Sequence, residues 1–165
     1  MGTTWRTFDW PGAALVAAAT LGALALGAFL SPGSDDPWYG ALRKAPLNPP
    51  DAAFAVIWPV LFLLMLAGAL LVLQEAGNFK RASAAMGLYF TMLAANVCWS
   101  LFFFGFSDPG IALGVLAALW LLIATMILRF AIHSPRAALL QVPYLLWVTF
   151  AAYLNISVLV LNPAP

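Results

Sequence analysis

Aromatic and amide side chains recur at helical spacing in two apolar stretches of the sequence. The first set is Asn96, Trp99, Ser100 and Phe103, and the second is Tyr144, Trp147, Ala151 and Asn155. The spacing within each set follows the helical repeat and places its members on one face of an α-helix. Together with Trp58 in a third apolar stretch, the two faces suit a large, flat, mainly apolar ligand held by stacking and a few hydrogen bonds.

Ordinary helix packing is the alternative interpretation of these residues. Taken singly, each is more often a packing aromatic, or an amide in an interhelical hydrogen bond worth about 0.6 kcal/mol. Their positions relative to the membrane and to the loops therefore decide between the two interpretations.

The composition is that of a membrane protein. Of the 165 residues, 64% are hydrophobic and 8% are charged, whereas soluble domains carry about 25% charged residues. The charged residues fall in short clusters that leave uncharged stretches at 13–30, 52–73, 82–106, 111–128 and 137–161. A span needs about 20 apolar residues. The sequence therefore predicts an all-α membrane protein, a bundle of five transmembrane helices forming one domain over residues 1–165.

Basic residues indicate how this bundle lies in the membrane. With five spans, one side carries five basic residues and the other carries two. The first group is Arg6, Lys80, Arg81, Arg129 and Arg136, and the second is Arg43 and Lys44. The positive-inside rule then predicts an inside N-terminus, with the first loop and the C-terminus outside.

The long connection at 31–51 has the composition of a lid. It contains Pro32, Pro37, Pro46, Pro49 and Pro50, the aromatic pair Trp38 and Tyr39, and both basic residues of that side. Proline stiffens a loop, whereas slack linkers are rich in Gly and Ser. Trp58 near the start of its span, and Phe103 and Asn155 near the ends of theirs, all come to lie beneath this loop. The sequence predicts a pocket there, with an aromatic wall and a lid.

Several function classes are disfavoured. None of the five stretches contains Asp, Glu, Lys, Arg or His, which argues against ion-coupled transport, charge-selective conduction and carboxylate-based hydrolysis. No conventional catalytic motif is present. The net charge of +1 gives no reason to expect nucleic acid binding. With one cysteine, Cys98, and one histidine, His133, we expect no metal site and no required cofactor.

The whole chain resembles the translocator protein family, also called TspO, tryptophan-rich sensory proteins or peripheral-type benzodiazepine receptors. The segments that carry the resemblance are Trp38-Tyr39, Leu42, Lys44, Asn48-Pro49-Pro50, Trp58, Asn96, Trp99-Ser100, Phe103-Phe104-Gly105, Pro143-Tyr144, Trp147, Ala151 and Leu154-Asn155. The resemblance implies binding of porphyrins such as protoporphyrin IX, and of similar hydrophobic ligands. It also implies that members commonly form homodimers, and that some bacterial members degrade bound porphyrin in light.

The resemblance and the helical faces together define the expected site. The ligand-binding residues are predicted to be Trp38, Tyr39, Arg43, Lys44, Asn48, Pro49, Trp58, Asn96, Trp99, Phe103, Tyr144, Trp147, Ala151 and Asn155. Arg43 and Lys44 would pair with porphyrin propionates, or else act as ordinary interfacial anchors. Trp58 and Trp147 match the tryptophans implicated in porphyrin degradation and are the catalytic candidates if that activity exists here. The functions under consideration are a tetrapyrrole receptor or sensor, light-dependent porphyrin degradation, and facilitated tetrapyrrole transport.

The chain departs from the family pattern at three places. Leu47 stands where a loop tryptophan is usual, and Leu101 replaces a proline. No basic residue follows Arg136, so the weak sterol motif at the end of the last span is absent. We therefore expect reduced stacking in the pocket and do not extend sterol recognition to this chain.

Rows of small residues are candidate helix contacts. They are Ala18, Gly22 and Gly27 in the first span and Gly110, Gly114 and Ala118 in the fourth. Such rows let helices approach closely, either within one protomer or across a homodimer.

Overall fold

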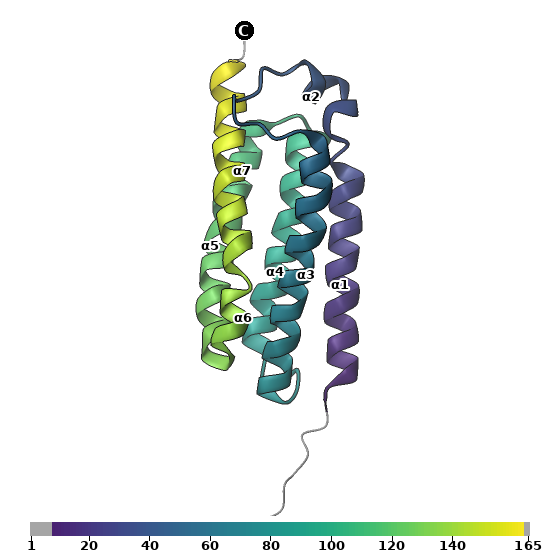
Figure 1. Cartoon of the computed structure of the whole chain (residues 1–165), viewed down its shortest axis with the longest axis vertical. Helices are drawn as coiled ribbons and strands as arrows, with labels where there is room; N and C mark the ends of the chain where they lie inside the picture. The colour runs from purple at the N-terminus through teal and green to yellow at the C-terminus, as the bar shows by residue number, and fades with distance from the viewer. Residues whose placement is uncertain (1–7, 164–165) are drawn as a thin grey trace, which may run out of the picture.

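The computed structural model describes residues 8–163 and contains no strand within them. Its long helices are α1 (Trp10–Leu30), α3 (Asp51–Ala76), α4 (Ser83–Ser100), α5 (Pro109–His133) and α7 (Val142–Leu161). The π-helical turn η2 (Leu101–Gly105) continues α4, and the short helix α6 (Pro135–Leu139) precedes α7. Within the described residues, five helical segments are long and apolar enough to cross a membrane, and they run side by side as one bundle (Figure 1). The predicted fold class is confirmed.

Short polar side chains and prolines fix where the helices begin. The side chains of Asp9, Asp108 and Ser134 each accept a hydrogen bond from the backbone N–H three residues further on, and each precedes a proline at the helix start. This arrangement satisfies N–H groups that lack a partner inside the helix. At the other end of α3, Gly77 adopts a left-handed conformation with a φ of 84°, which glycine tolerates without strain.

Helix α5 extends beyond the predicted span 111–128 and continues through Arg129 to His133. An uncharged run measures the apolar part of a span, whereas the helix continues into the membrane interface, where charged side chains are solvated. The predicted stretch 137–161 lies within Pro135–Leu161, a segment long and apolar enough to cross a membrane. The helix is broken within this segment at Leu140 and Gln141, between α6 and α7.

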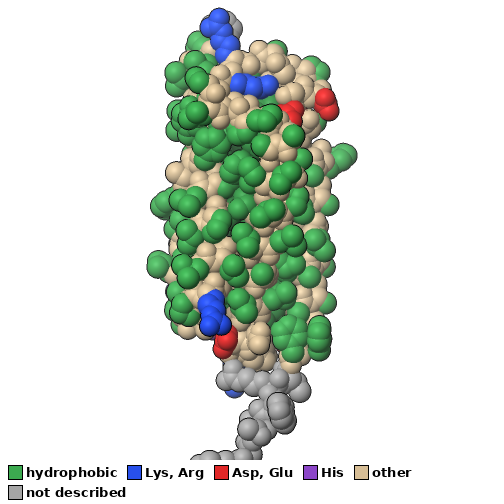
Figure 2. Space-filling view, viewed as in Figure 1, with side chains coloured by type: hydrophobic (Ala, Val, Ile, Leu, Met, Phe, Trp, Pro, Cys, Tyr) green, Lys and Arg blue, Asp and Glu red, His purple; other side chains and the backbone are tan. Residues whose placement is uncertain are grey.

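The two ends of the bundle differ. The 31–51 connection, which contains η1 (Gly33–Asp35) and α2 (Pro37–Ala41), covers the end at which the C-terminus lies (Figure 1). At the opposite end, the Asp9 carboxylate accepts a hydrogen bond of 2.7 Å from the Phe79 N–H, so the start of α1 meets the α3–α4 turn. Figure 2 shows basic and acidic side chains near both ends of the visible face and an uncharged surface between them. Arg6 lies outside the described residues, and which end faces the cell interior stays a prediction.

Tight packing is concentrated in the half of the bundle away from the lid. The buried residues of α1 are Gly12, Ala13, Val16 and Thr20, and those of α3 begin only at Leu61. Around them, Met65, Tyr89, Met92, Ile123 and Phe130 are fully buried. No residue of α1 after Thr20 and none of α3 before Leu61 is buried, so this part of the bundle leaves internal space.

The small-residue row of the fourth span does not pack inside the protomer. Gly110, Gly114 and Ala118 are all exposed on α5, and a side chain added at Gly114 would meet nothing within 4 Å. Packing within the protomer is therefore excluded for this row. A homodimer contact there stays a prediction.

The Asp9 carboxylate provides the first testable prediction. The N–H groups of Gly12 and Phe79 hold the pKa of the Asp9 carboxyl below its ordinary value of 3.8. A lowered pKa in the folded protein means that the stabilisation is present above pH 3.8 and is lost as the pH falls through the folded value. Asp9→Ala is expected to lower the thermal unfolding midpoint at pH 7, and this difference from wild type should shrink below pH 3.8.

Thermal unfolding of the protein in detergent across this pH range checks the prediction. The matched control is Asp35→Ala, which removes an exposed carboxylate in η1. If Asp9→Ala lowers the midpoint by the same amount at every pH, the stabilisation by Asp9 does not depend on its negative charge, and the prediction is wrong.

Candidate functional site

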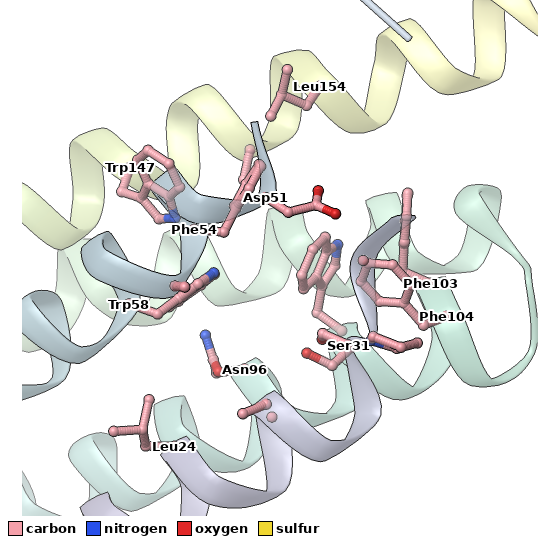
Figure 3. A pocket seen from close by; sticks show the side chains of 18 of the residues that line it. Leu24, Ser31, Asp51, Phe54, Trp58, Asn96, Phe103, Phe104, Trp147 and Leu154 are labelled. Atoms are coloured by element: carbon pink, nitrogen blue, oxygen red, sulfur yellow. The ribbon is translucent and has the colours of Figure 1, made fainter. Parts of the chain in front are cut away.

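A cavity of about 610 Å³ lies in the lid-side half of the bundle. Its walls come from α1, the lid, α3, α4 with η2, and α7. Figure 3 shows these side chains converging on one space from several helices. This volume is within the range of about 300–1,000 Å³ that is typical of small-molecule sites.

Aromatic rings form two groups around the cavity. In the first, the ring centroids of Trp58 and Trp147 are 6.3 Å apart with nearly perpendicular planes, and Phe54 lies 5.7 Å from Trp147. In the second, Trp99 stacks on Phe103 at 5.3 Å. Figure 3 shows Trp58 and Trp147 at one end of the cavity and Phe103 at the other. Flat apolar surface is therefore available at both ends.

The amides near the cavity are largely occupied by partners within the protein. The Asn96 amide N–H donates to the Tyr144 hydroxyl at 2.7 Å. Asn155 accepts from the Trp99 indole N–H at 3.2 Å and donates to the Pro109 carbonyl at 2.8 Å. Asn155 thus fixes the position of Trp99 and of the start of α5. Asn155 also lines the cavity, and its role as a ligand-binding residue stays a prediction.

Trp147 carries a polar group without a partner among the described residues. Its indole Nε1 is buried and has no hydrogen-bond acceptor there, although the ring lines the cavity. A buried unpaired N–H costs about 1–3 kcal/mol. Because the nitrogen itself is buried, an acceptor in the cavity would meet it only after the ring or its neighbours shift.

The lid is held over the cavity by aromatic and polar contacts. Trp38 packs edge-on against Phe103 at 5.6 Å, and Tyr39 packs against Phe104 at 5.2 Å. On the α7 side, the Asn162 amide accepts from the Arg43 N–H at 2.9 Å and donates to the Arg43 carbonyl at 3.0 Å. The predicted lid is therefore an ordered cover fastened to two other elements.

The turn η2 determines how the second aromatic group reaches the cavity. The Phe106 N–H donates to the Leu101 carbonyl at 3.0 Å, which is the wider repeat of a π-helix. The turn begins at Leu101, where the family that the sequence resembles usually has proline. Extra backbone in a π turn changes the angle between successive side chains. Both Phe103 and Phe104 line the cavity from this turn.

Most of the predicted site residues meet in this cavity. Those on its wall are Tyr39, Asn48, Trp58, Asn96, Trp99, Phe103, Trp147, Ala151 and Asn155. Those absent from the wall are Trp38, Arg43, Lys44, Pro49 and Tyr144. Trp38 lies in the lid and packs against Phe103. Tyr144 is fully buried and accepts a hydrogen bond from Asn96. The Lys44 ammonium lies 4.2 Å from the centroid of the Tyr39 ring.

Other wall residues were not predicted from the sequence. They include Leu24 and Gly27 of α1, Ser31 directly after it, Phe54 and Asp51 of α3, and Leu154 of α7. Leu24, Gly27 and Ser31 follow helical spacing, but this spacing also fits a helix that only packs against its neighbours. Phe54 stands one turn before Trp58, and this spacing was a signal that could have identified it.

The fold and the cavity define a polytopic membrane protein built around an internal aromatic chamber beneath an ordered loop. The chain belongs to the TspO/MBR family, whose sequence model matches residues 13–161. This agrees with the resemblance seen in the motifs of the loop, α3, α4 and α7.

Relatives from distant organisms share this sequence over most of their length. The chain is 39% identical to the tryptophan-rich protein TspO of Chlorobaculum tepidum, over 76% of this chain and 80% of that protein. It is 36% identical to the tryptophan-rich sensory protein of Cereibacter sphaeroides, over 98% of this chain and 95% of that protein. It is 37% identical to the human translocator protein, over 73% of this chain and 72% of that protein.

Proposed function

We propose that this protein is a membrane receptor that binds protoporphyrin IX-like tetrapyrroles, and similar flat hydrophobic ligands, in the cavity beneath the lid. The observation that carries the proposal is the cavity of about 610 Å³ with indole rings at both ends. A planar macrocycle stacks on such rings, which also exclude water. The family members named sensory protein support a role in which occupancy of the site is the signal.

The side chains divide the binding task. Trp58 and Trp147 supply stacking surface at one end, and Trp99 and Phe103 supply it at the other. On binding, a shift of the Trp147 ring lets its N–H, which is buried without a partner among the described residues, donate to a pyrrole nitrogen or a propionate oxygen. Outside the wall, Arg43 and Lys44 place positive charge on the lid, where propionates that protrude from the cavity would meet them.

The site is suited to metal-free porphyrin. The described cavity-lining residues include no His, Cys or Met. Of the usual axial ligands of haem iron they include only a tyrosine, Tyr39, whose ring is engaged by Phe103, Phe104 and the Lys44 ammonium. Cys98 is exposed, away from the cavity, and His133 ends α5 at the opposite end of the bundle from the lid.

We therefore expect no axial histidine or thiolate ligation when iron protoporphyrin binds, and no strong gain in affinity from iron. Absorbance spectra of the bound haem in lipid nanodiscs check this prediction. A ligand-field band that disappears in His133→Ala or Cys98→Ala would contradict it.

Light-dependent porphyrin degradation is the second candidate function. The observation that favours it is the contact between Trp58 and Trp147, which places two oxidisable indoles on the cavity wall. Photoexcited porphyrin draws an electron from a stacked indole or transfers energy to oxygen. If the indoles take part, Trp58→Phe and Trp147→Phe slow the loss of porphyrin absorbance under illumination.

A titration tests the proposed function. Protoporphyrin IX is added to the protein in lipid nanodiscs while tryptophan fluorescence is followed, in darkness and then in light. Saturable quenching is expected for wild type and for Trp120→Phe, whose ring is exposed on α5 outside the cavity. The Trp58→Phe/Trp147→Phe variant should bind much more weakly. Linear quenching that is indifferent to these substitutions would reject the site.

Facilitated transport is distinguished by a separate measurement. The relatives named translocator protein make it worth testing. Flux of protoporphyrin IX into sealed vesicles is compared with flux into protein-free vesicles. Faster flux in the presence of the protein indicates transport, and equal flux indicates a receptor that only binds the ligand.

A further inference from the structure

The wall residues of the cavity differ in exposure from one helix to another. Of the residues that line it, the exposed ones are Leu21, Ala25, Ala28, Pro32, Asp51 and Ala55. All of them belong to α1, the residues that follow it, or the first turns of α3. The wall residues contributed by α4, η2 and α7 are buried or half-buried. The cavity therefore opens on the side where α1 and α3 meet.

Packing of α1 and α3 gives independent support for this opening. No residue of α1 is buried after Thr20, and none of α3 is buried before Leu61. On the lid side, α1 and α3 therefore reach the core only through partly buried side chains such as Leu24 and Trp58, and the two helices lie next to each other in the bundle (Figure 1). A side chain added at Gly22 would meet nothing within 4 Å.

Between α1 and α3, the rim of this opening is formed by small apolar side chains. Ala25 and Ala28 form the α1 side, and Ala55 forms the α3 side with Pro59 one turn further on. Proline has no N–H, so the carbonyl of Ala55 lacks its usual helical donor. The opening thus presents alanine methyl groups and one carbonyl acceptor at the level of the lipid chains.

Above the cavity, the lid is held in place by several contacts. Trp38 and Tyr39 rest on Phe103 and Phe104. Asn162 fastens the lid to α7, and Asp51 fastens it to α3 by accepting a hydrogen bond of 2.9 Å from the Ser34 N–H. A ligand that entered through the lid would have to break these contacts, whereas the exposed wall residues of α1 and α3 are already accessible from outside.

We propose that ligands reach the cavity from within the bilayer, through a lateral portal between α1 and α3 bounded by Leu21, Ala25, Ala28 and Ala55. The proposal rests on the proposed function, since it assigns the access route of that site. It also narrows the ligand class to amphiphiles that partition into membranes before they bind. Their polar groups remain toward the lid, and their apolar edge enters between the helices.

Kinetics of protoporphyrin IX binding in nanodiscs test the portal. Ala25→Leu/Ala55→Leu adds bulk to both edges, and the association and dissociation rate constants are expected to fall together, each by about tenfold, the effect of about 1.4 kcal/mol on a barrier. The matched control, Ala18→Leu, adds the same bulk at an exposed α1 position away from the cavity and should change neither rate.

A variant of the lid separates the two routes. Asn162→Ala removes the fastening to Arg43, and it should leave the association rate at the wild-type value. Faster association in Asn162→Ala, with unchanged rates in the double leucine variant, would overturn the portal in favour of access from water. Absence of saturable binding in wild type would instead reject the proposed function and the portal together.

A chemical version of the test covers failure of the leucine variant to accumulate. Ala25→Cys in a Cys98→Ala background is purified and then modified with an apolar maleimide. Slower association after modification supports the portal, and an unchanged rate in fully modified protein contradicts it.

Discussion

Trp147→Phe is expected to raise the dissociation constant for protoporphyrin IX about tenfold while leaving the thermal unfolding midpoint close to wild type. In the ligand-free protein the indole N–H is buried without a partner, which costs about 1–3 kcal/mol. A bound acceptor removes that cost and adds a hydrogen bond, so its loss in the variant weakens binding by about 1.4 kcal/mol, or tenfold. For folding, the smaller ring loses packing surface, but removal of the unpaired donor offsets that loss.

A tryptophan that only packs would behave differently. Its replacement by phenylalanine would lower the unfolding midpoint and would not raise the dissociation constant tenfold. Trp120 is the matched control, because its indole N–H donates to the Thr149 hydroxyl at 2.9 Å outside the cavity. Trp120→Phe should leave the dissociation constant unchanged. Equal dissociation constants for wild type and Trp147→Phe would show that the N–H does not contact ligand.

The sequence was sufficient to predict the bundle and the location of the cavity. Uncharged stretches gave the spans, and helical spacing placed Asn96 with Trp99 and Trp147 with Ala151 on faces that do meet beneath the 31–51 loop. These predictions succeeded because a helix crossing a membrane has a fixed rise per residue, so depth follows from position in the chain.

Details that depend on tertiary contacts could not be predicted in this way. Periodicity places Asn155 on the pocket face but does not reveal that Trp99 and Pro109 occupy both ends of its amide. The contribution of α1 was missed because Gly27 and its neighbours are equally typical of a packing row. The burial of Gln141 was not predicted either, because it follows from the break between α6 and α7.

Gly68→Ala is expected to destabilise the protein by about 2 kcal/mol, in the range of overpacked cores. A methyl group at this position would collide with the Gln141 side-chain amide and would lie 3.0 Å from the Ala137 carbonyl oxygen. Gln141 is fully buried, and its amide N–H donates to that same carbonyl at 3.3 Å. The amide therefore cannot withdraw without breaking its hydrogen bond, and α3 must move away from the junction of α6 and α7.

The control and the rescue for this prediction come from the same chain. Gly87→Ala, also within a helix but with nothing within 4 Å of the new methyl group, should be neutral or stabilise by about 0.5–1 kcal/mol, because glycine is a poor helix former. In Gly68→Ala/Gln141→Ala the collision with the amide is gone, so a coupling of about 1 kcal/mol is expected between the two sites. Reversible unfolding in mixed detergent micelles is measured for wild type, Gly68→Ala, Gln141→Ala, the double variant and Gly87→Ala. If Gly68→Ala and Gly87→Ala are equally stable, α3 does not pack against Gln141 as closely as the structure shows.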